Sequence, residues 1–294
     1  MQPMRLLLLF VPLLSGLCDT TGLRRDYLLM FWNVENFFES SRHFSDKCAG
    51  IAKTIFLAGD EFGALPDLVG LAEVGSGAVL RKLISRTGLR KCEYGIIHFD
   101  SPDRRGIDCA LLYRRSRFRL LHTAPRHIYD ACGRLLPTRD ILLAVLEPAE
   151  EDASPLAVLV NHHPSKIGRD SGERRFLAMT RLLRLRDSLR SEGVERIVAV
   201  GDFNDTVVPP PGVEAVYPPR AGTIKFQGKW EKIDGCPVLE GMTAREHIFA
   251  PRHLSARDRR FGGEKPLRTF SGPRYLGGLS DHYPVVLEIS KNNP

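Results

Sequence analysis

Two runs of the chain join a short apolar stretch to polar side chains that could do hydrolytic chemistry. Residues 198–205 read VAVGDFND and residues 279–289 read LSDHYPVVLEI. An apolar stretch of about four to eight residues is typical of a buried strand, and ligands commonly bind at the ends of such strands. Carboxylate, amide and imidazole groups gathered there could support metal-assisted attack of water on a phosphate ester.

The polar residues of these two runs have the spacing of a catalytic cluster. Asp202 and Asn204 flank Phe203, so a strand that continued through them would point both to one pocket, whereas a tight Asx turn is the alternative. Asp281 and His282 directly precede an apolar strand. An imidazole beside a carboxylate can move or orient protons near neutral pH, although such a pair can also simply cap a strand.

Three further polar residues lie at the ends of apolar runs. Glu73 ends LVGLAEV, where a carboxylate is costly to bury unless it binds a hard cation or pairs with an arginine. Asn33, in WNVEN, could reach the same metal or a phosphate oxygen, while the neighbouring Glu35 is expected to face away. Asp234, in WEKIDG, could accept the Nδ1 proton of a histidine and so fix its orientation.

The run VNHHPSK follows another apolar stretch. His162 or His163 could protonate a leaving oxygen or bind the scissile phosphate, and Lys166 could neutralise phosphate charge. Asp108, in RRGIDCALLY, follows two arginines, so it is either a buried acid paired with arginine or a catalytic acid.

The pattern of apolar residues predicts many strands and few helices. Helices are expected over 45–58, 77–85 and 171–191, and long loops over 207–219 and 251–278. Strands are expected over 27–34, 68–74, 94–99, 107–113, 118–121, 141–146, 156–161, 197–200, 223–226, 233–239 and 283–289. This order favours an α+β fold in which two sheets pack face to face with helices outside.

The first residues and the composition indicate an exported protein with a mild excess of positive charge. Residues 1–18 have the charged start and short apolar stretch of a signal peptide, and the bulky residue before Cys18 argues against a lipid anchor there. The sequence carries 42 basic and 35 acidic residues, a formal charge of +7, which favours a polyanionic partner only mildly. Six cysteines without CxxC spacing argue against a zinc knuckle, and export would permit disulfides that the sequence cannot assign.

The clusters WNVEN, LAEV, RGIDCALLY, VNHHPSK, GDFND, KID and SDH occur in this order along residues 27–289. This order resembles the deoxyribonuclease I-like endonuclease/exonuclease/phosphatase superfamily, and VNHHPSK resembles the form found in exported bacterial members. The resemblance implies one domain over 24–292, a four-layer αββα sandwich, and a divalent metal, usually Mg²⁺, with Mn²⁺ or Ca²⁺ as alternatives.

The resemblance also assigns roles. It implies metal ligands Glu73, Asn33 and Asp281, and catalytic residues Asp202, Asn204, His282, Asp234 and His162. His163 and, from the residues of VNHHPSK alone, Lys166 are the expected substrate-binding residues. In the family's common pattern this histidine is followed by Leu, whereas here the chain reads His162, His163 and Pro164, so which imidazole acts stays open.

These expectations lead to a metal-dependent phosphodiester hydrolase, a secreted or periplasmic endonuclease acting on DNA or RNA. The alternative is a phosphatase or sphingomyelinase-like enzyme acting on a phospholipid or inositol phosphate, and only this alternative would require membrane contact. A binding protein that merely keeps the fold would not need so complete a set of acids and imidazole. No obligate protein partner is evident, and a monomer is expected.

Overall fold

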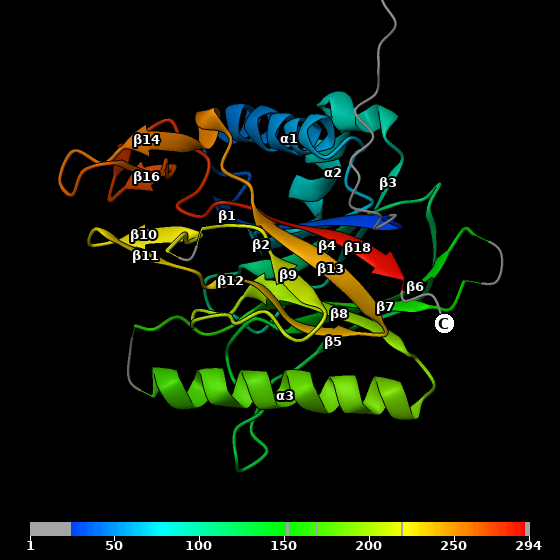
Figure 1. Ribbon diagram of the computed structural model, residues 1–294. Coiled ribbons are helices and arrows are strands. Elements are labelled where there is room, and N and C mark those ends of the chain that lie inside the picture. The colour runs from blue at the N-terminus through cyan, green and yellow to red at the C-terminus, as the bar shows by residue number, and fades with distance from the viewer. Residues whose placement is uncertain (1–24, 151–152, 168–169, 219, 292–294) are drawn as a thin grey trace, which may run out of the picture.

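Two β-sheets packed face to face form the centre of the molecule, with helices on both outer faces (Figure 1). The computed structural model describes residues 25–150, 153–167, 170–218 and 220–291. The expected signal peptide and Cys18 lie outside the described residues, as do residues 24 and 292, the ends of the expected domain.

The first sheet has seven strands in the order β3-β4-β2-β1-β18-β13-β9. β1 lies in the middle, parallel to β2 and antiparallel to β18. The strands are β1 (Tyr27–Phe37), β2 (Leu68–Val74), β3 (Tyr94–His98), β4 (Asp108–Arg114), β9 (Val213–Ala215), β13 (Met242–Ile248) and β18 (Val285–Lys291).

The second sheet has five strands in the order β12-β8-β7-β6-β5. They are β5 (Phe118–Arg126), β6 (Ile141–Pro148), β7 (Leu156–His162), β8 (Arg196–Asp202) and β12 (Asp234–Glu240). Helices α1 (Phe44–Glu61) and α2 (Gly77–Ser85) cover the first sheet, and α3 (Ser171–Ser191) covers the second (Figure 1). Short 3₁₀ turns span Gly88–Lys91 and Arg252–Leu254.

The alternation of side chains along β1 explains the layers. Leu29 and Phe31 point between the two sheets, whereas Leu28, Met30 and Trp32 point outward against the helices. Successive residues of a strand face opposite sides, so an apolar run that is buried on both sides belongs to a central strand. A third core joins α3 to the second sheet. Three cores between four layers confirm the expected αββα sandwich.

The structure corrects three parts of the element prediction. The stretch 207–219, expected to be a loop, contains β9, which pairs with β13. β13 was not expected, although it pairs with β18 along its whole length. The stretch 251–278, expected to be one loop, contains two short hairpins, β14 (Ser255–Arg257) with β15 (Glu264–Pro266), and β16 (Phe270–Ser271) with β17 (Arg274–Tyr275). A third hairpin joins β10 (Ile224–Phe226) to β11 (Lys229–Glu231).

The five cysteines in the described part of the chain are all free thiols, three of them buried. Burial raises the pKa of the Cys48 thiol to about 11, so this thiol stays protonated at neutral pH. None of the described helices combines the length and the apolar character needed to cross a lipid bilayer.

Candidate active site

The ends of three neighbouring strands bring polar residues to one edge of the second sheet. In the strand register Asp202, at the end of β8, lies opposite Asp234 of β12 on one side and His162 of β7 on the other. The first sheet contributes Asn33, whose Nδ2 donates a 3.0 Å hydrogen bond to Asp202 Oδ2. The site therefore spans the gap between the sheets, and Asp202 is its buried centre.

His282 reaches Asp202 from the loop before β18. Its Nδ1 lies 2.8 Å from Asp234 Oδ2, and its Nε2 lies 3.9 Å from Asp202 Oδ2. The backbone of His282 is also fixed, because Trp32 Nε1 donates a 2.9 Å hydrogen bond to its carbonyl. Since Nδ1 faces a carboxylate, Nε2 is the nitrogen directed toward Asp202.

The surroundings of Asp202 and His282 shift the pKa values of both side chains. Burial, together with the nearby charge of Asp234, raises the pKa of Asp202 to about 7. Burial alone would lower the pKa of His282, but the attraction of Asp234, with smaller contributions from Asp202 and Asp281, holds that pKa well above 6.5. Strongly shifted pKa values of a carboxyl and an imidazole in one buried cluster are typical of catalytic sites.

The turn after β8 differs from the strand that the spacing suggested. The strand ends at Asp202, and Asp202 Oδ1 accepts a 2.9 Å hydrogen bond from the backbone N–H of Asn204, which forms an Asx turn. Asn204 has φ of 49°, a left-handed conformation that asparagine adopts readily, and its Nδ2 donates to the His163 carbonyl at 3.0 Å. Gly201 is required here, because a Cβ atom at this position would lie 2.4 Å from the Asn161 carbonyl oxygen.

The two adjacent histidines have different surroundings. His162 Nε2 lies 3.5 Å from Asp202 Oδ2, whereas the His163 ring packs edge-on against Phe203 with 4.8 Å between ring centroids. Burial, with the positive charge of Arg139, lowers the pKa of His162 well below 6.5 and that of His163 to about 3. The structure brings the His162 ring into the site. His163 contributes only its backbone carbonyl, which accepts the hydrogen bond from Asn204.

Lys166 is exposed and forms an ion pair with Glu231 rather than with any of these side chains. Among the described residues, the structure shows no contact of Lys166 with the buried group around Asp202.

Glu73 lies at the end of β2, beside the site. Its neighbour Ala72 pairs with Asn33, and its Oε2 accepts a 2.9 Å hydrogen bond from the backbone N–H of Asn36. The backbone of Glu73 has φ of 64°, a strained conformation that costs roughly 1–3 kcal/mol and is concentrated at functional sites. Among the described residues its carboxylate forms no ion pair within 4 Å, although Lys47 and Arg268 lie near enough to feel its charge.

Glu35 does not face away, and that expectation was wrong. The residue is buried, its Oε1 lies 3.0 Å from Arg268 Nη2, and its Oε2 accepts a 2.8 Å hydrogen bond from the backbone N–H of Thr269. Arg268 Nη2 also lies 3.1 Å from Asp281 Oδ2. Arg268 thus joins Glu35 to Asp281 immediately beside His282.

A buried lysine lies beside the Glu35, Arg268 and Asp281 cluster. Lys47 of α1 donates to the Glu35 carbonyl and, at 2.8 Å, to Thr269 Oγ1. Burial lowers the pKa of Lys47 to about 8, despite the opposing attraction of Glu35, Glu73 and Asp281. Neither Lys47 nor Arg268 was expected. A signal for the first was available, because Lys47 shares the helix stripe of the apolar Ile51 and Ile55.

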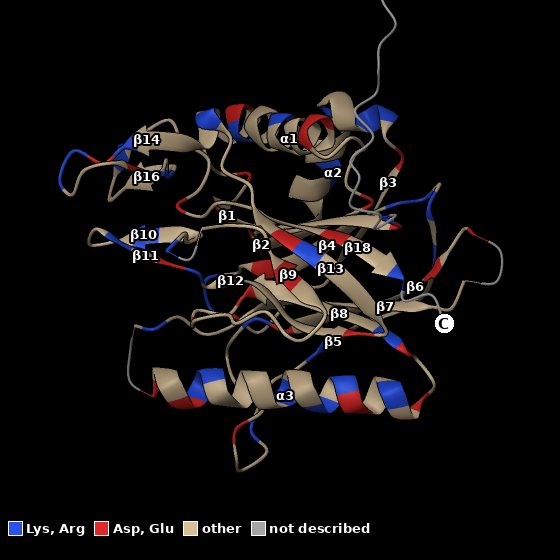
Figure 2. Cartoon of the chain, viewed as in Figure 1, with Lys and Arg blue, Asp and Glu red and all other residues tan. Residues whose placement is uncertain are grey.

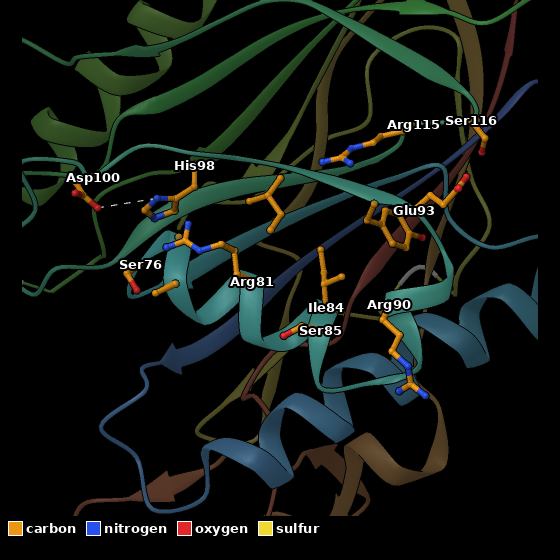
Figure 3. A pocket seen from close by; sticks show the side chains of 14 residues that line it. Ser76, Arg81, Ile84, Ser85, Arg90, Glu93, His98, Asp100, Arg115 and Ser116 are labelled. Atoms are coloured by element: carbon orange, nitrogen blue, oxygen red, sulfur yellow. Dashed lines mark ion pairs between the residues drawn. The ribbon is translucent and has the colours of Figure 1, made fainter.

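A second polar cluster lies outside this site. Asp108 Oδ2 lies 3.2 Å from His98 Nε2, so the buried acid pairs with a histidine and not with an arginine. His98 lines a groove of about 1220 Å³ between α2 and β3, together with Arg81, Arg90 and Arg115 (Figure 3). Neither Asp202 nor His282 contributes to this groove.

Comparison with known proteins agrees with this arrangement of residues. Residues 33–215 and 212–291 match the model of the endonuclease/exonuclease/phosphatase family. The chain belongs to this family. No curated protein sequence matches it.

Several solved structures share the fold. A family member from Bacteroides thetaiotaomicron is 14% identical with a TM-score of 0.60, covering 91% of this chain and 98% of that one. The catalytic domain of human Nocturnin, with bound sulfate, is 17% identical with a TM-score of 0.57, covering 90% of this chain and 93% of that one. The mannosyl-6-phosphatase of Bacteroides thetaiotaomicron VPI-5482 is 14% identical with a TM-score of 0.57, covering 90% and 99%. At these identities the likeness concerns the fold.

The family contains phosphoesterases that depend on divalent metals, which supports an enzyme here. The acidic side chains at the strand ends could bind such a metal. Asp202, Asp234 and His282 bring their ligand atoms within 4.8 Å of one another, but the hydrogen bond between the last two already occupies His282 Nδ1. The Glu73 carboxylate forms no ion pair within 4 Å among the described residues, so its oxygens are also candidate ligands for a cation.

Proposed function

We propose that the chain is an exported, metal-dependent phosphodiester hydrolase that cleaves nucleic acid. The observation that carries the proposal is the buried group of three side chains, in which Asp202 faces an imidazole that Asp234 holds in place. A structural ion pair would need one acid for one imidazole. Here a second acid, with a pKa of about 7, remains available to exchange protons.

The chain's own residues divide the chemistry. Once ionised, Asp202 can accept a proton from the attacking water, and the Asn33 amide orients the receiving oxygen. His282 keeps Nδ1 bound to Asp234 and presents Nε2, from which a proton can pass to a phosphate oxygen or to the leaving oxygen. His162 is neutral at pH 7 because its pKa is low, so it serves as a hydrogen-bonding group rather than as the proton donor.

A divalent cation would be held by Glu73 with the side-chain oxygen of Asn33, and it would neutralise charge that develops on the phosphate oxygens. Asn33 Oδ1 accepts a 3.0 Å hydrogen bond from the backbone N–H of Glu35, and an amide oxygen has a second lone pair for the cation. Asp281 is already paired with Arg268, so its proposed role is to help keep the His282 imidazole protonated rather than to bind the metal. Mg²⁺ is proposed because hard oxygen ligands suit it.

Nucleic acid is the preferred substrate because the whole chain carries more basic than acidic residues, with a formal charge of +7. Arg139 and Arg105 lie near enough to lower the pKa of His162, but both pair with Asp103. A polyanion is attracted by a net positive charge. Export through residues 1–18 is part of the same proposal, and the protein would act as a monomer on extracellular or periplasmic DNA or RNA.

A panel of substrates tests the proposal. Purified protein would be offered plasmid DNA, RNA, sphingomyelin, an inositol polyphosphate and mannose 6-phosphate, with Mg²⁺ or with EDTA, beside the Asp202→Asn variant. We expect Mg²⁺-dependent cleavage of nucleic acid that falls by about 10²–10⁴-fold in the variant. Release of phosphate or phosphocholine, with nucleic acid left intact, would retain the site and replace the substrate. Full activity of the variant would contradict the assigned site.

A further inference from the structure

Two hairpins pack together beside the active site and form what is called here the rim lobe, residues 224–231 and 255–266. β10–β11 and β14–β15 lie next to each other at one end of the molecule (Figure 1). Lys225 of the first hairpin donates a 2.6 Å hydrogen bond to the Gly262 carbonyl of the second and lies 3.1 Å from Asp258. The Phe261 ring packs on the turn of the first hairpin, where a Cβ at Gly228 would lie 2.9 Å from it.

The base of the lobe is bonded to the neighbours of the catalytic residues. Thr223 directly precedes the first hairpin. Its hydroxyl accepts a 3.3 Å hydrogen bond from the backbone N–H of Asp234. Its carbonyl accepts a 2.8 Å hydrogen bond from Tyr283, the residue after His282. β10 then extends three residues from Thr223, roughly 10 Å. These two hydrogen bonds fix the base of the lobe beside Asp234 and His282, and the tip extends from there along the edge of the site.

The surface of the lobe combines aromatic and basic side chains. Phe226 is 58% exposed and Phe261 is 47% exposed, and the Arg260 guanidinium lies 5.1 Å above the Phe261 ring. The two segments contain six basic and three acidic residues, and two of the acids are neutralised by Lys225 and Lys166. Four exposed cations have no ion-pair partner within the described residues: Lys229, Arg257, Arg259 and Arg260 (Figure 2 colours Lys and Arg blue).

We propose that the rim lobe binds single-stranded nucleic acid as it enters the active site. Bases would stack on Phe226 and Phe261, and the unpaired cations would contact the phosphates. This combination of aromatic faces with a basic surface is what single-stranded nucleic acid requires, because every base has a face that can stack. The inference rests on the proposed function and narrows it to strands whose bases are unpaired.

A membrane surface is the other polyanion to consider. Binding to lipid through a protein surface needs a sizeable apolar face. At the tips of the lobe Phe226 and Phe261 are followed by Gln227, Gly228, Gly262 and Gly263, and they are the two large apolar side chains of the lobe that are exposed. The lobe therefore fits stacked bases better than an acyl layer.

The experiment compares a large and a small substrate on the same proteins. The Phe226→Ala/Phe261→Ala protein would be assayed with a fluorescein-labelled single-stranded oligonucleotide and with bis(p-nitrophenyl) phosphate, which is too small to reach the lobe. Phe226→Trp/Phe261→Trp keeps the stacking surface. Phe176→Ala, which removes a 69% exposed phenylalanine from α3, is the matched control. Binding of each protein to phosphatidylserine vesicles would be measured in parallel.

We expect the double alanine variant to raise KM for the oligonucleotide by about 10-fold or more, from the loss of two stacked bases. Turnover of the small diester should stay unchanged, and the tryptophan variant and Phe176→Ala should match the wild type. An unchanged KM for the oligonucleotide, or binding to vesicles but not to the oligonucleotide, would overturn the role of the lobe. Failure of the wild type to hydrolyse either substrate would instead overturn the proposed function.

Discussion

The substitution His163→Phe tests whether His163 is buried in its neutral form, through its effect on the pH dependence of stability. The His163 ring is 1% exposed and packs edge-on against Phe203, and its Nε2 has no hydrogen-bond partner within the part of the chain that the structure describes. Phenylalanine preserves the ring contact and removes a buried polar atom that bonds to nothing. The backbone carbonyl of residue 163, which supports Asn204, is unaffected.

The expected magnitude follows from the pKa of His163, which burial lowers from 6.5 to about 3. Below pH 6.5 the unfolded chain takes up a proton that the native protein does not, so the free energy of the unfolded state falls relative to that of the native state, and the unfolding free energy decreases. The contribution is fully present above pH 6.5 and is lost as the pH falls toward 3. One pKa unit corresponds to about 1.4 kcal/mol, so about 2 kcal/mol is lost between pH 7 and pH 5.

Urea unfolding at pH 7 and at pH 5 measures this loss. The decrease in unfolding free energy between the two pH values should be smaller in His163→Phe than in the wild type by about 2 kcal/mol. Any packing effect that does not depend on pH cancels in this comparison. An equal decrease in the two proteins would refute the argument that His163 is buried in its neutral form.

Three further predictions concern the backbone, the imidazole and the metal. Gly201→Ala should lower the unfolding free energy by about 1–3 kcal/mol, because the new Cβ meets a carbonyl on β7; thermal unfolding beside Gly172→Ala, whose Cβ meets nothing, checks this. Asp234→Asn should lower kcat by about 10²-fold or more and move the loss of imidazolium at His282 to lower pH, as a pH–rate profile would show, whereas an unchanged profile would contradict the assigned contact. Glu73→Gln should raise the Mg²⁺ concentration for half-maximal activity by about 10-fold or more, and an unchanged metal titration would place the cation elsewhere.

Much of the fold could be predicted from the sequence because apolar periodicity is strong where packing is regular. The helix expected over 171–191 has these bounds in the structure, and β1 begins at the expected residue. β13 was missed because the buried position that continues Met242 and Ala244 is Glu246, which breaks the apolar alternation. The sheet tolerates that acid because Lys232, 2.6 Å away, and the hydroxyl of Tyr217 satisfy it.

The candidate site also contains residues that the sequence could predict and residues that it could not. Residues at strand ends could be expected to converge, and the structure brings Asn33, Asp202, Asp234 and His282 into one buried group. Glu35 could not be placed, because the backbone after Asn33 leaves the regular register and Glu35 takes φ of 46°. Arg268 could not be predicted either, since it meets Glu35 from 233 residues away through a loop with no periodic signal.

The most direct test is the hydrolysis of bis(p-nitrophenyl) phosphate by the wild type, His282→Ala and His163→Phe, each with Mg²⁺ and with EDTA. The two substitutions remove buried imidazoles, but only one of them faces Asp202. The wild type and His163→Phe should be active with Mg²⁺ and inactive with EDTA, and His282→Ala should be slower by about 10²–10⁴-fold. A His282→Ala protein as active as the wild type would contradict the assignment of phosphodiester hydrolysis to this site.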